Sequence, residues 1–278
     1  MADTVSVMRR FSSRAKNGVI HGIKSGVSVN ADSATNPRVT WNLIRLQETT
    51  STNDICRDLP PWTAVRADSQ TRGRGRFGRA FASGKGGLWL SASLPATGPA
   101  EVWAGFSLRV GASLLAHLKS IGLAAARLRW PNDILCGPRK LAGLIIEQPA
   151  SGQLIVGFGV NVLNEPWNDS PELRETATRL ADWISPVPDL ENLTTGILDA
   201  LADAHRQMLA TGMRGAIEEL NAYWTEPMPV EISLSSGGTV RGSFVGLAPN
   251  GHLQLLDHAG SVFLVEYPTV ERLRELDA

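Results

Sequence analysis

The sequence predicts an α+β protein with a mixed, mostly antiparallel sheet and helices, followed by a small C-terminal β-barrel of SH3-like size. Several short alternating apolar segments lack regular helices between them, which favours antiparallel strands. Residues 101–121 and 189–210 are amphipathic and predict long helices. From Met228 onward, short apolar runs alternate with Gly- and Asn-containing turns, which predicts strands alone. We therefore expect a disordered leader, a large domain and a small domain at residues 1–40, 41–226 and 227–278.

Turn and cap residues define the first elements of the large domain. Residues 42–47 alternate weakly and predict a strand. The run from Glu48 to Asp54 is rich in hydroxyl side chains, which is typical of a helix N-terminus, so we expect a short helix toward Arg57. Residues 62–67 predict a second short strand that leads into a glycine-rich segment.

Residues 87–94 alternate clearly and predict a strand with two different faces. One face carries Leu88, Leu90, Ala92 and Leu94, and the other carries Trp89, Ser91 and Ser93. The half-polar face beside the glycine-rich segment is either one wall of a polar ligand pocket or a solvated surface. The sequence leaves both interpretations open.

The remaining elements are assigned from periodicity and turn residues. Gly157 and Gly159 lie inside a predicted strand, where glycine often marks the close approach of a ligand or a second backbone. Gly137 and Pro138 predict the turn of a hairpin. In the large domain we expect strands at 125–130, 134–136, 141–147 and 154–163 and further helices at 189–210 and 213–225. In the small domain, to which we assign a supporting role, we expect strands at 230–234, 239–246, 253–257 and 262–267.

The segment between Asp68 and Lys85 is the strongest functional signal, because arginine and glycine alternate in it. It contains Arg72, Arg74, Arg76 and Arg79 together with Gly73, Gly75 and Gly78. Glycine at this density is unfavourable in a helix or strand, and clustered arginines repel one another unless an anion lies among them. Backbone amides approach a ligand closely where there is no Cβ, and guanidinium groups pair with phosphate oxygens. The pattern predicts a loop that closes over a polyanion.

Two phosphate-binding motifs fit this segment poorly. Gly73, Gly75 and Gly78 satisfy the dinucleotide pattern G-x-G-x-x-G, but the residues that follow cannot begin the helix which that pattern needs. Gly84–Lys85 is followed by glycine rather than Ser or Thr, so it is not a Walker A loop. A permanently disordered Arg–Gly linker is disfavoured because this single cluster is flanked by strand-like segments, whereas a loop that orders only when a ligand binds remains an open alternative.

Composition excludes several classes of protein. The chain has 278 residues, 43% hydrophobic and 19% charged, with a formal net charge of zero. The arginine cluster is therefore a local feature, which argues against nucleic acid as the partner.

Cys56 and Cys136 lie far apart and no histidine pair has metal-ligand spacing, so we expect no metal held by Cys or His. The cysteines fit a reducing, cytoplasmic setting, and no apolar run approaches membrane-spanning length.

Residues 1–40 differ from the rest of the chain. They are rich in Ser, Ala, Asn and basic residues, and they contain only two acids, Asp3 and Asp32. A disordered leader is the favoured interpretation. An organellar transit peptide is the alternative, although the helical periodicity is poor.

A second group of candidate functional residues lies between Leu128 and Glu147. Arg139 and Lys140 come at a hairpin turn just before an apolar strand. Alone, the lysine is best interpreted as a solvated turn residue. In combination with the Arg–Gly loop, Trp130–Asp133 and Gly157–Asn161, it is better interpreted as a cation directed into a ligand cleft.

Together these segments resemble a biotin–protein ligase, or biotin-[acetyl-CoA-carboxylase] ligase, in the form without an N-terminal DNA-binding domain. The resemblance runs from about residue 41 to the end and rests on five motifs in order. The matching segments are Ser51–Asn53, Gln70–Arg79, Arg129–Asp133, Arg139–Gly143 and Gly157–Asn161. It implies the class II synthetase-like fold of the biotin/lipoate ligase catalytic domain. Without the DNA-binding domain, a role in transcription is not expected.

The chain departs from the family pattern at three places. Arg129 replaces the usual lysine, which keeps the charge but changes the geometry. Phe81 stands where tryptophan is usual, and either ring could pack on adenine. Ser83–Gly87 departs from the usual Ser-Pro-x-Gly. None of these changes removes a group that the chemistry needs.

The resemblance implies two acyl transfers that use ATP and biotin as substrates, with Mg²⁺ bound mainly to phosphate. Biotin and ATP would give biotinyl-5′-AMP and pyrophosphate, and a lysine of a biotin carboxyl carrier protein, part of a biotin-dependent carboxylase, would then take the biotinyl group. Lys140 would bridge the biotin carboxylate and the α-phosphate. Arg74 and Arg76 would order over the intermediate and the pyrophosphate. Asp133 would steer or deprotonate the incoming lysine, or it simply caps a turn.

The resemblance also implies a binding set around these catalytic residues. Ser51, Thr52 and Gln70 would bind the ureido ring, and Asn132 and Asn161 would contact nucleotide and metal. The full substrate-binding set is Ser51, Thr52, Asn53, Gln70, Gly73, Arg74, Gly75, Arg76, Phe81, Trp89, Asn132, Lys140, Gly143, Gly157 and Asn161.

Three other functions compete with this one. A lipoate–protein ligase has the same fold, but the complete Gly-Arg-Gly-Arg-x-Gly-Arg run favours biotin. A non-enzymatic RNA-binding protein would need a basic surface and stacking aromatics, yet the net charge is zero and there are only two tyrosines. A binding module without turnover is disfavoured by the intact Lys140. The fold of the family often pairs through sheet edges, so a homodimer is an alternative to a monomer.

Overall fold

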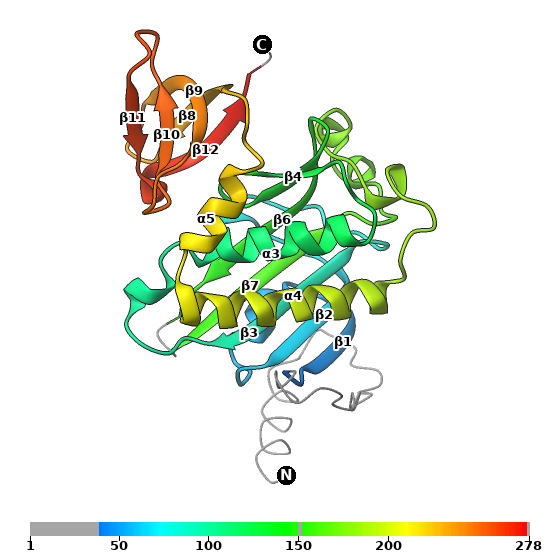
Figure 1. The fold of residues 1–278 in the computed structure, drawn as a ribbon. Helices are drawn as coiled ribbons and strands as arrows, with labels where there is room; N and C mark the ends of the chain where they lie inside the picture. Colours follow the sequence, from blue (N-terminus) through cyan, green and yellow to red (C-terminus); the bar gives the residue numbers. More distant parts are fainter. Residues whose placement is uncertain (1–38, 150–151, 277–278) are drawn as a thin grey trace.

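The computed structural model describes residues 39–149 and 152–276, and it contains two sheets that are separate in sequence (Figure 1). The larger sheet has seven strands in the order β1-β2-β3-β7-β6-β5-β4, and the smaller has five in the order β11-β10-β9-β8-β12. Among the described residues, β1 and β2 are the only neighbouring strands of the larger sheet that pair in parallel. The expected α+β class with a mostly antiparallel sheet and a C-terminal β-sheet domain is therefore confirmed. The expected leader lies almost wholly outside the described residues.

The large sheet is built from the predicted segments. Its strands are β1 (Asn42–Thr49), β2 (Thr63–Gln70), β3 (Leu88–Pro95), β4 (Ala126–Arg129), β5 (Asp133–Cys136), β6 (Arg139–Glu147) and β7 (Gln153–Val160). Its helices are α2 (Thr52–Cys56), α3 (Phe106–Ser120), α4 (Leu190–Thr211) and α5 (Arg214–Asn221). Among the described residues, α3 and α4 cross one face of the sheet, and α5 leads toward the smaller sheet (Figure 1).

Alternation on β3 separates the two faces of the large sheet. Leu88, Leu90 and Leu94 pack in the main core with α3 and α4. The opposite face carries a smaller core under α2, formed by Cys56, Leu59, Val65 and Ile155. Ser91 and Ser93 on that face are fully buried, so the interpretation of a solvated surface is wrong. The α2 side is therefore a covered and partly polar layer.

Two elements differ from the expectation. The helix expected over 101–121 begins at Phe106, because Gly105 takes a left-handed conformation after a short 3-10 turn at Ala100–Trp103. Strand β12 (Val270–Glu275) was not predicted. Its buried residues Val270 and Leu273 are three apart, since a register shift interrupts its pairing with β8. This spacing hides the alternation that identifies a strand.

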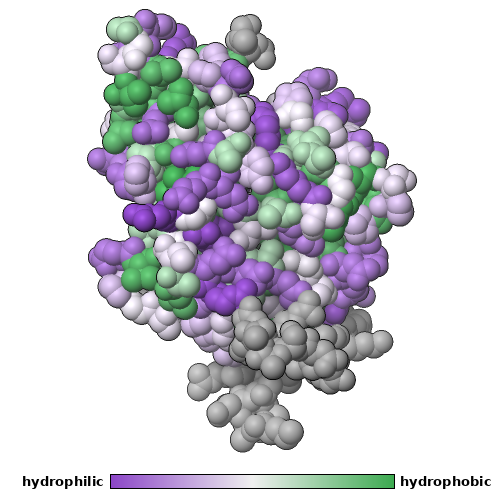
Figure 2. All heavy atoms as spheres, viewed as in Figure 1, coloured by the Kyte–Doolittle hydropathy of each residue, from purple (hydrophilic) through white to green (hydrophobic). Residues whose placement is uncertain are grey.

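The small sheet packs against the large domain through side chains from both. Its other strands are β8 (Met228–Leu234), β9 (Thr239–Leu247), β10 (Leu253–Leu256) and β11 (Val262–Val265). Trp224 and Phe244 meet edge to face with ring centroids 4.9 Å apart, and Trp130 meets Tyr267 at 5.4 Å. The apolar surface visible over the small sheet in Figure 2 includes its edge strand β11, on which Val262 is 56% exposed.

Glycine in β7 permits close packing of α2. A Cβ at Gly157 would lie 2.2 Å from Oδ1 of Asn53 and 2.9 Å from Cγ2 of Ile145. The Asn53 side chain cannot move away freely, because its Oδ1 accepts a hydrogen bond from the buried hydroxyl of Ser91. The position of α2 on the sheet therefore requires glycine at 157.

We predict that Gly157→Ala lowers the free energy of unfolding by about 1–3 kcal/mol, as overpacking of a filled interior usually does. Urea denaturation monitored by tryptophan fluorescence measures this. Gly75→Ala is the matched control, because a Cβ there would meet nothing nearer than 3.9 Å. Equal stability of the two variants would contradict the packing argument.

His205 of α4 is buried in an aromatic cluster. Its ring stacks on Trp103 at 5.0 Å, and Trp62 and Phe106 contact it edge-on. Burial lowers the pKa of His205 below its ordinary value, and the Nε2–H bond to the carbonyl of Pro95 opposes this only in part. Burial also lowers the pKa of His117. Both histidines are thus neutral in the folded state at neutral pH.

A lowered histidine pKa gives stability that is complete above the unfolded pKa of about 6.5 and declines as pH falls below it, because the unfolded chain takes up the proton more readily. We therefore predict that the free energy of unfolding falls between pH 7.5 and pH 5.5. His205→Gln, which keeps a donor for Pro95, should reduce that fall. Carboxylates titrate mainly below this window, and an identical pH dependence in both proteins would contradict the prediction.

Candidate active site

The candidate active site lies on the α2 side of the large sheet, where strand register aligns residues from three of the motifs with Trp89 of β3. Directly paired residues form a row across the sheet in which Trp89 faces Gly159, Gly159 faces Gly143, Gly143 faces Asp133, and Asp133 faces Arg129. Side chains at paired positions lie on the same face. The sheet thus brings together residues that are far apart in sequence.

A network of uncharged polar groups surrounds the N-terminus of α2. The backbone N–H and hydroxyl of Thr52 donate to Oε1 of Gln70 at 2.8 and 3.1 Å. The Thr52 and Ser91 hydroxyls are 2.6 Å apart, and Ser91 donates to Oδ1 of Asn53 at 2.5 Å. Thr52, Asn53 and Ser91 are all nearly inaccessible to solvent. The network links α2, β2 and β3 into one rigid polar wall.

Asn53 has an unused donor in this wall. Within the described part of the chain, its buried Nδ2 has no hydrogen-bond partner. A buried donor without a partner is unfavourable by about 1–3 kcal/mol. The wall therefore suits a ligand that carries a hydrogen-bond acceptor.

A charged cluster lies farther along the same face. Nζ of Lys140 is 2.7 Å from Oδ1 of Asp133, and Arg129 donates to Oδ2 at 2.7 Å. Burial acts to raise the pKa of Asp133, but the charges of Lys140 and Arg129 and their hydrogen bonds outweigh it, so the pKa lies below its usual value. Asp133 is therefore ionised at neutral pH, and two cations against one carboxylate leave an excess positive charge for an anion.

These contacts also distinguish the two roles considered for Asp133. Both of its carboxylate oxygens are engaged in ion pairs rather than in capping a turn. A lowered pKa makes a weaker base, which favours an orienting role over direct removal of a proton.

A bulge brings Lys140 onto this face. The pairing of β5 with β6 changes register between Ile134 and Leu135, and bulges redirect side chains. The Lys140 chain then extends over Gly143, where a Cβ would lie 3.1 Å from its Cε. The bulge and the glycine together place the ammonium group beside Asp133.

Phe81 connects the Arg–Gly loop to the site. Its ring meets Trp89 edge-on with centroids 5.9 Å apart, and Nζ of Lys140 lies 5.3 Å from its centroid. A Cβ at Gly159 would be 2.8 Å from the ring, so glycine allows the ring to lie on the strand. Gly73 is similarly restricted, because a Cβ there would lie 2.3 Å from the Ser83 hydroxyl. The loop is thus fitted closely to the face of the sheet.

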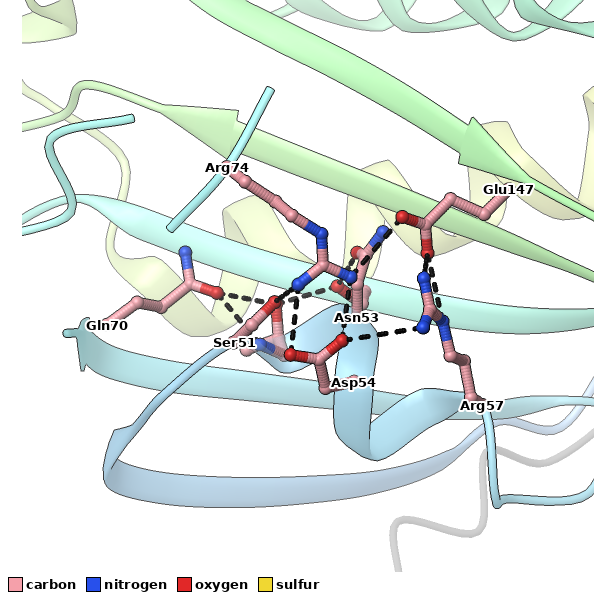
Figure 3. Close-up of polar contacts among 9 residues, drawn as sticks. Ser51, Asn53, Asp54, Arg57, Gln70, Arg74 and Glu147 are labelled. Carbon is pink, nitrogen blue, oxygen red and sulfur yellow. Dashed lines mark hydrogen bonds and ion pairs between the residues drawn. The ribbon is translucent and has the colours of Figure 1, made fainter. Parts of the chain in front are cut away.

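The arginines of the loop point in different directions. Arg74 donates twice to Asp54, at 2.9 and 2.7 Å, and once to Glu147 at 3.3 Å (Figure 3). Arg76 donates to the carbonyl of Val270 in the small sheet and lies 5.3 Å from the ring centroid of Tyr267. The expectation that Arg74 and Arg76 cover the same phosphates as Lys140 stays a prediction, since the contacts of each arginine described here are with protein groups.

The two predicted asparagines make internal hydrogen bonds. Nδ2 of Asn132 donates to the carbonyl of Leu144 at 2.7 Å. Asn161 is buried, donates to the carbonyl of Thr178 and accepts from Asn164. Both therefore shape the backbone around the site, and their contact with nucleotide and metal stays a prediction.

Several residues at the site were not predicted. Ser91 was identified only as one member of a polar strand face, although it is central to the network. Asp54 and Glu147 carry no motif signal, because their importance depends on tertiary contacts with Arg74. The alternation of β3 with its buried serines could have identified Ser91.

Within residues 39–149 and 152–276, no group of three His, Cys, Asp or Glu side chains is arranged to hold a metal ion. Among the same residues, no helix has both the length and the apolar character needed to cross a membrane.

Comparisons with known proteins identify the family of the chain. Residues 43–161 match the family model described as "Biotin/lipoate A/B protein ligase family". The biotin--[acetyl-CoA-carboxylase] ligase of Mycobacterium tuberculosis is 30% identical over 213 residues, which cover 75% of this chain and 78% of that protein. The bifunctional ligase/repressor BirA of Bacillus subtilis is 31% identical over 161 residues, covering 56% of this chain and 49% of BirA. The chain thus matches about half the length of BirA.

A solved structure matches over most of the fold. The biotin protein ligase of Aquifex aeolicus, in complex with biotin and ATP, aligns with a TM-score of 0.74 and 27% identity. The alignment covers 84% of this chain and 99% of that one. From its sequence and its fold, the chain belongs to the biotin/lipoate A/B protein ligase family.

Proposed function

We propose that this protein is a biotin–protein ligase that uses ATP to attach biotin to a lysine of a biotin carboxyl carrier protein. The observation that carries the proposal is the position of two different clusters on one sheet face. The uncharged network of Thr52, Gln70 and Asn53 suits a small polar ring, and the positive cluster around Lys140 suits anions. The names of the M. tuberculosis and A. aeolicus relatives support the same activity.

The first step joins two anions, so its main electrostatic difficulty is their repulsion. A carboxylate oxygen of biotin attacks the α-phosphorus of ATP, and the bond from that phosphorus to the bridging oxygen breaks as pyrophosphate leaves. In this proposal, Lys140 contacts both the carboxylate and the α-phosphate, and its charge stabilises the transition state. Asp133 holds the ammonium group in place, and Arg129 adds positive charge. Interactions of this kind typically contribute a few kcal/mol.

In the second step, the amine of the acceptor lysine attacks the carbonyl carbon of biotinyl-5′-AMP. An amide forms, and AMP leaves with the oxygen that bridged carbon and phosphorus. The low pKa of Asp133 makes it a weak base, so its part in this step is to hold Lys140 in place, and the proton lost by the amine passes to solvent.

The remaining predicted groups bind and shield the reacting molecules. Ser51, Thr52 and Gln70 bind the ureido ring of biotin, while Phe81 packs against adenine at the floor formed by Gly143 and Gly159. Mg²⁺ enters as part of the MgATP substrate, because the site offers cations rather than a cluster of acids to the phosphates. The loop excludes water from a mixed anhydride that would otherwise hydrolyse.

We predict that Lys140→Ala lowers the rate of biotin transfer to a carrier domain at least about 100-fold, because a preorganised cation at the developing charge is lost. The assay follows labelled biotin with MgATP and a biotin carboxyl carrier domain. Lys119→Ala is the matched control: Lys119 also lies over an aromatic ring, 3.8 Å from the Tyr223 centroid, but it belongs to α3 on the opposite face.

The same assay with lipoate separates the two acids of the family. Labelling with biotin and none with lipoate is the expected result. Labelling with lipoate alone would show that the protein is a lipoate–protein ligase instead. Full activity of Lys140→Ala would contradict the role proposed for Lys140.

A further inference from the structure

Four charged side chains form a closed ring at the edge of the polar wall (Figure 3). Arg74 pairs with Asp54 and Glu147, and Arg57 pairs with the same two carboxylates. Asp54 and Arg57 belong to α2 and its C-terminus, Glu147 ends β6, and Arg74 comes from the Arg–Gly loop. The ring therefore ties the loop to two elements of the sheet layer.

The geometry of the ring is specific. Arg74 and Asp54 form two parallel hydrogen bonds, and Nη1 of Arg74 also reaches the Ser51 hydroxyl at 3.2 Å. The side chains of Arg74 and Glu147 are only 25% and 19% exposed, so solvent screens their interaction less than that of a surface pair. Hydrogen bonding to Asp54, followed by the charges of both carboxylates, raises the pKa of Arg74 above its ordinary value despite partial burial.

The ring differs in charge from the cluster around Lys140. Two arginines and two carboxylates sum to zero, whereas Lys140, Arg129 and Asp133 leave an excess positive charge. An arginine neutralised by two carboxylates attracts phosphate weakly, because phosphate must displace partners that already bond it. Arg74 is consequently better suited to hold the loop than to bind an anion.

Holding Arg74 also fixes the rest of the loop. Arg74 forms a β-bridge with Ala80, and the N–H of Phe81 donates to the carbonyl of Gly73 at 2.9 Å. The two sides of the loop therefore move together. Release of Arg74 would free Phe81 from the floor at Gly159, where its ring lies against the sheet.

We propose that Asp54 and Glu147 are positioning residues that hold the Arg–Gly loop shut through Arg74, and so keep water from the bound adenylate. The inference rests on the proposed function, in which biotinyl-5′-AMP forms beneath the loop. When the ring is broken, water attacks the mixed anhydride and releases biotin and AMP without a carrier.

Trypsin tests the ring without any ligand or activity, because the loop contains four arginines as cleavage sites. Glu147→Gln and Asp54→Asn keep the side-chain shapes and remove one charge each. Mass spectrometry measures the rate of cleavage between residues 72 and 79. We expect this rate to become about fivefold higher in each variant, because a half-buried ion pair is lost.

Glu231→Gln is the matched control. Glu231 also accepts hydrogen bonds from two arginines, Arg241 and Arg274, and its side chain is 20% exposed, but it lies in the small sheet. Its variant should be cleaved in the loop at the wild-type rate. Loop cleavage that is unchanged in Glu147→Gln and Asp54→Asn, or equally increased in Glu231→Gln, would overturn the proposal.

The second measurement is AMP release from biotin and MgATP without carrier. We expect it to rise about fivefold in Glu147→Gln and Asp54→Asn relative to the wild-type protein and Glu231→Gln, matching the change in loop opening. A merely structural role would lower all activity instead of raising this reaction. If the wild-type protein forms no adenylate, the proposed function fails, while the trypsin comparison still decides whether the ring holds the loop.

Discussion

The α2 side of the large sheet depends on glycine at Gly143, Gly157 and Gly159. A Cβ at Gly157 would collide with Asn53 and one at Gly159 with Phe81, whereas a Cβ at Gly143 would crowd the end of the Lys140 side chain. The backbone itself therefore forms the floor, and side chains from a helix, a loop and a hairpin lie directly on it. Without this constraint, α2 could not pack where its polar N-terminus faces the sheet, and the Arg–Gly loop could not lie flat.

On this floor the protein keeps different electrostatic environments a short way apart. The wall at Thr52 and Asn53 is uncharged and buried, the cluster at Lys140 has an excess positive charge, and the ring at Arg74 is neutral. Ion pairing accounts for the difference, because each carboxylate cancels one cation. The many arginines of the loop therefore need not all contact phosphate. Arg74 pairs with acids, and Arg76 reaches the small sheet.

Much of this organisation is predictable from the sequence, because it depends on local patterns. The alternation of residues 87–94 correctly separated a core face from a polar face. The glycines of β7 do mark a close approach, but the groups that approach are the side chains of Asn53 and Phe81 rather than a ligand or a second backbone. The family followed from five motifs in order, and the α+β class followed from strand-like segments without regular helices between them. Local patterns failed where tertiary contacts decide: β12 is interrupted by a register shift, and Gly105 delays the start of α3. In the sequence, Glu147 is only a charged residue at the end of a predicted strand. Its pairing with Arg74 can be recognised only in the folded structure.

The proposed mechanism requires that a carboxylate placed beside Lys140 attacks the α-phosphorus of ATP. Biotin labelled with ¹⁸O in its carboxylate tests it most directly, by mass spectrometry of the AMP released on transfer to a carrier domain. Attack through the carboxylate leaves one labelled oxygen in each AMP, because the carbon–oxygen bond breaks when the acceptor amine attacks the carbonyl carbon. AMP without ¹⁸O, alongside biotinylated carrier, would contradict an adenylate intermediate and with it the mechanism assigned to this site.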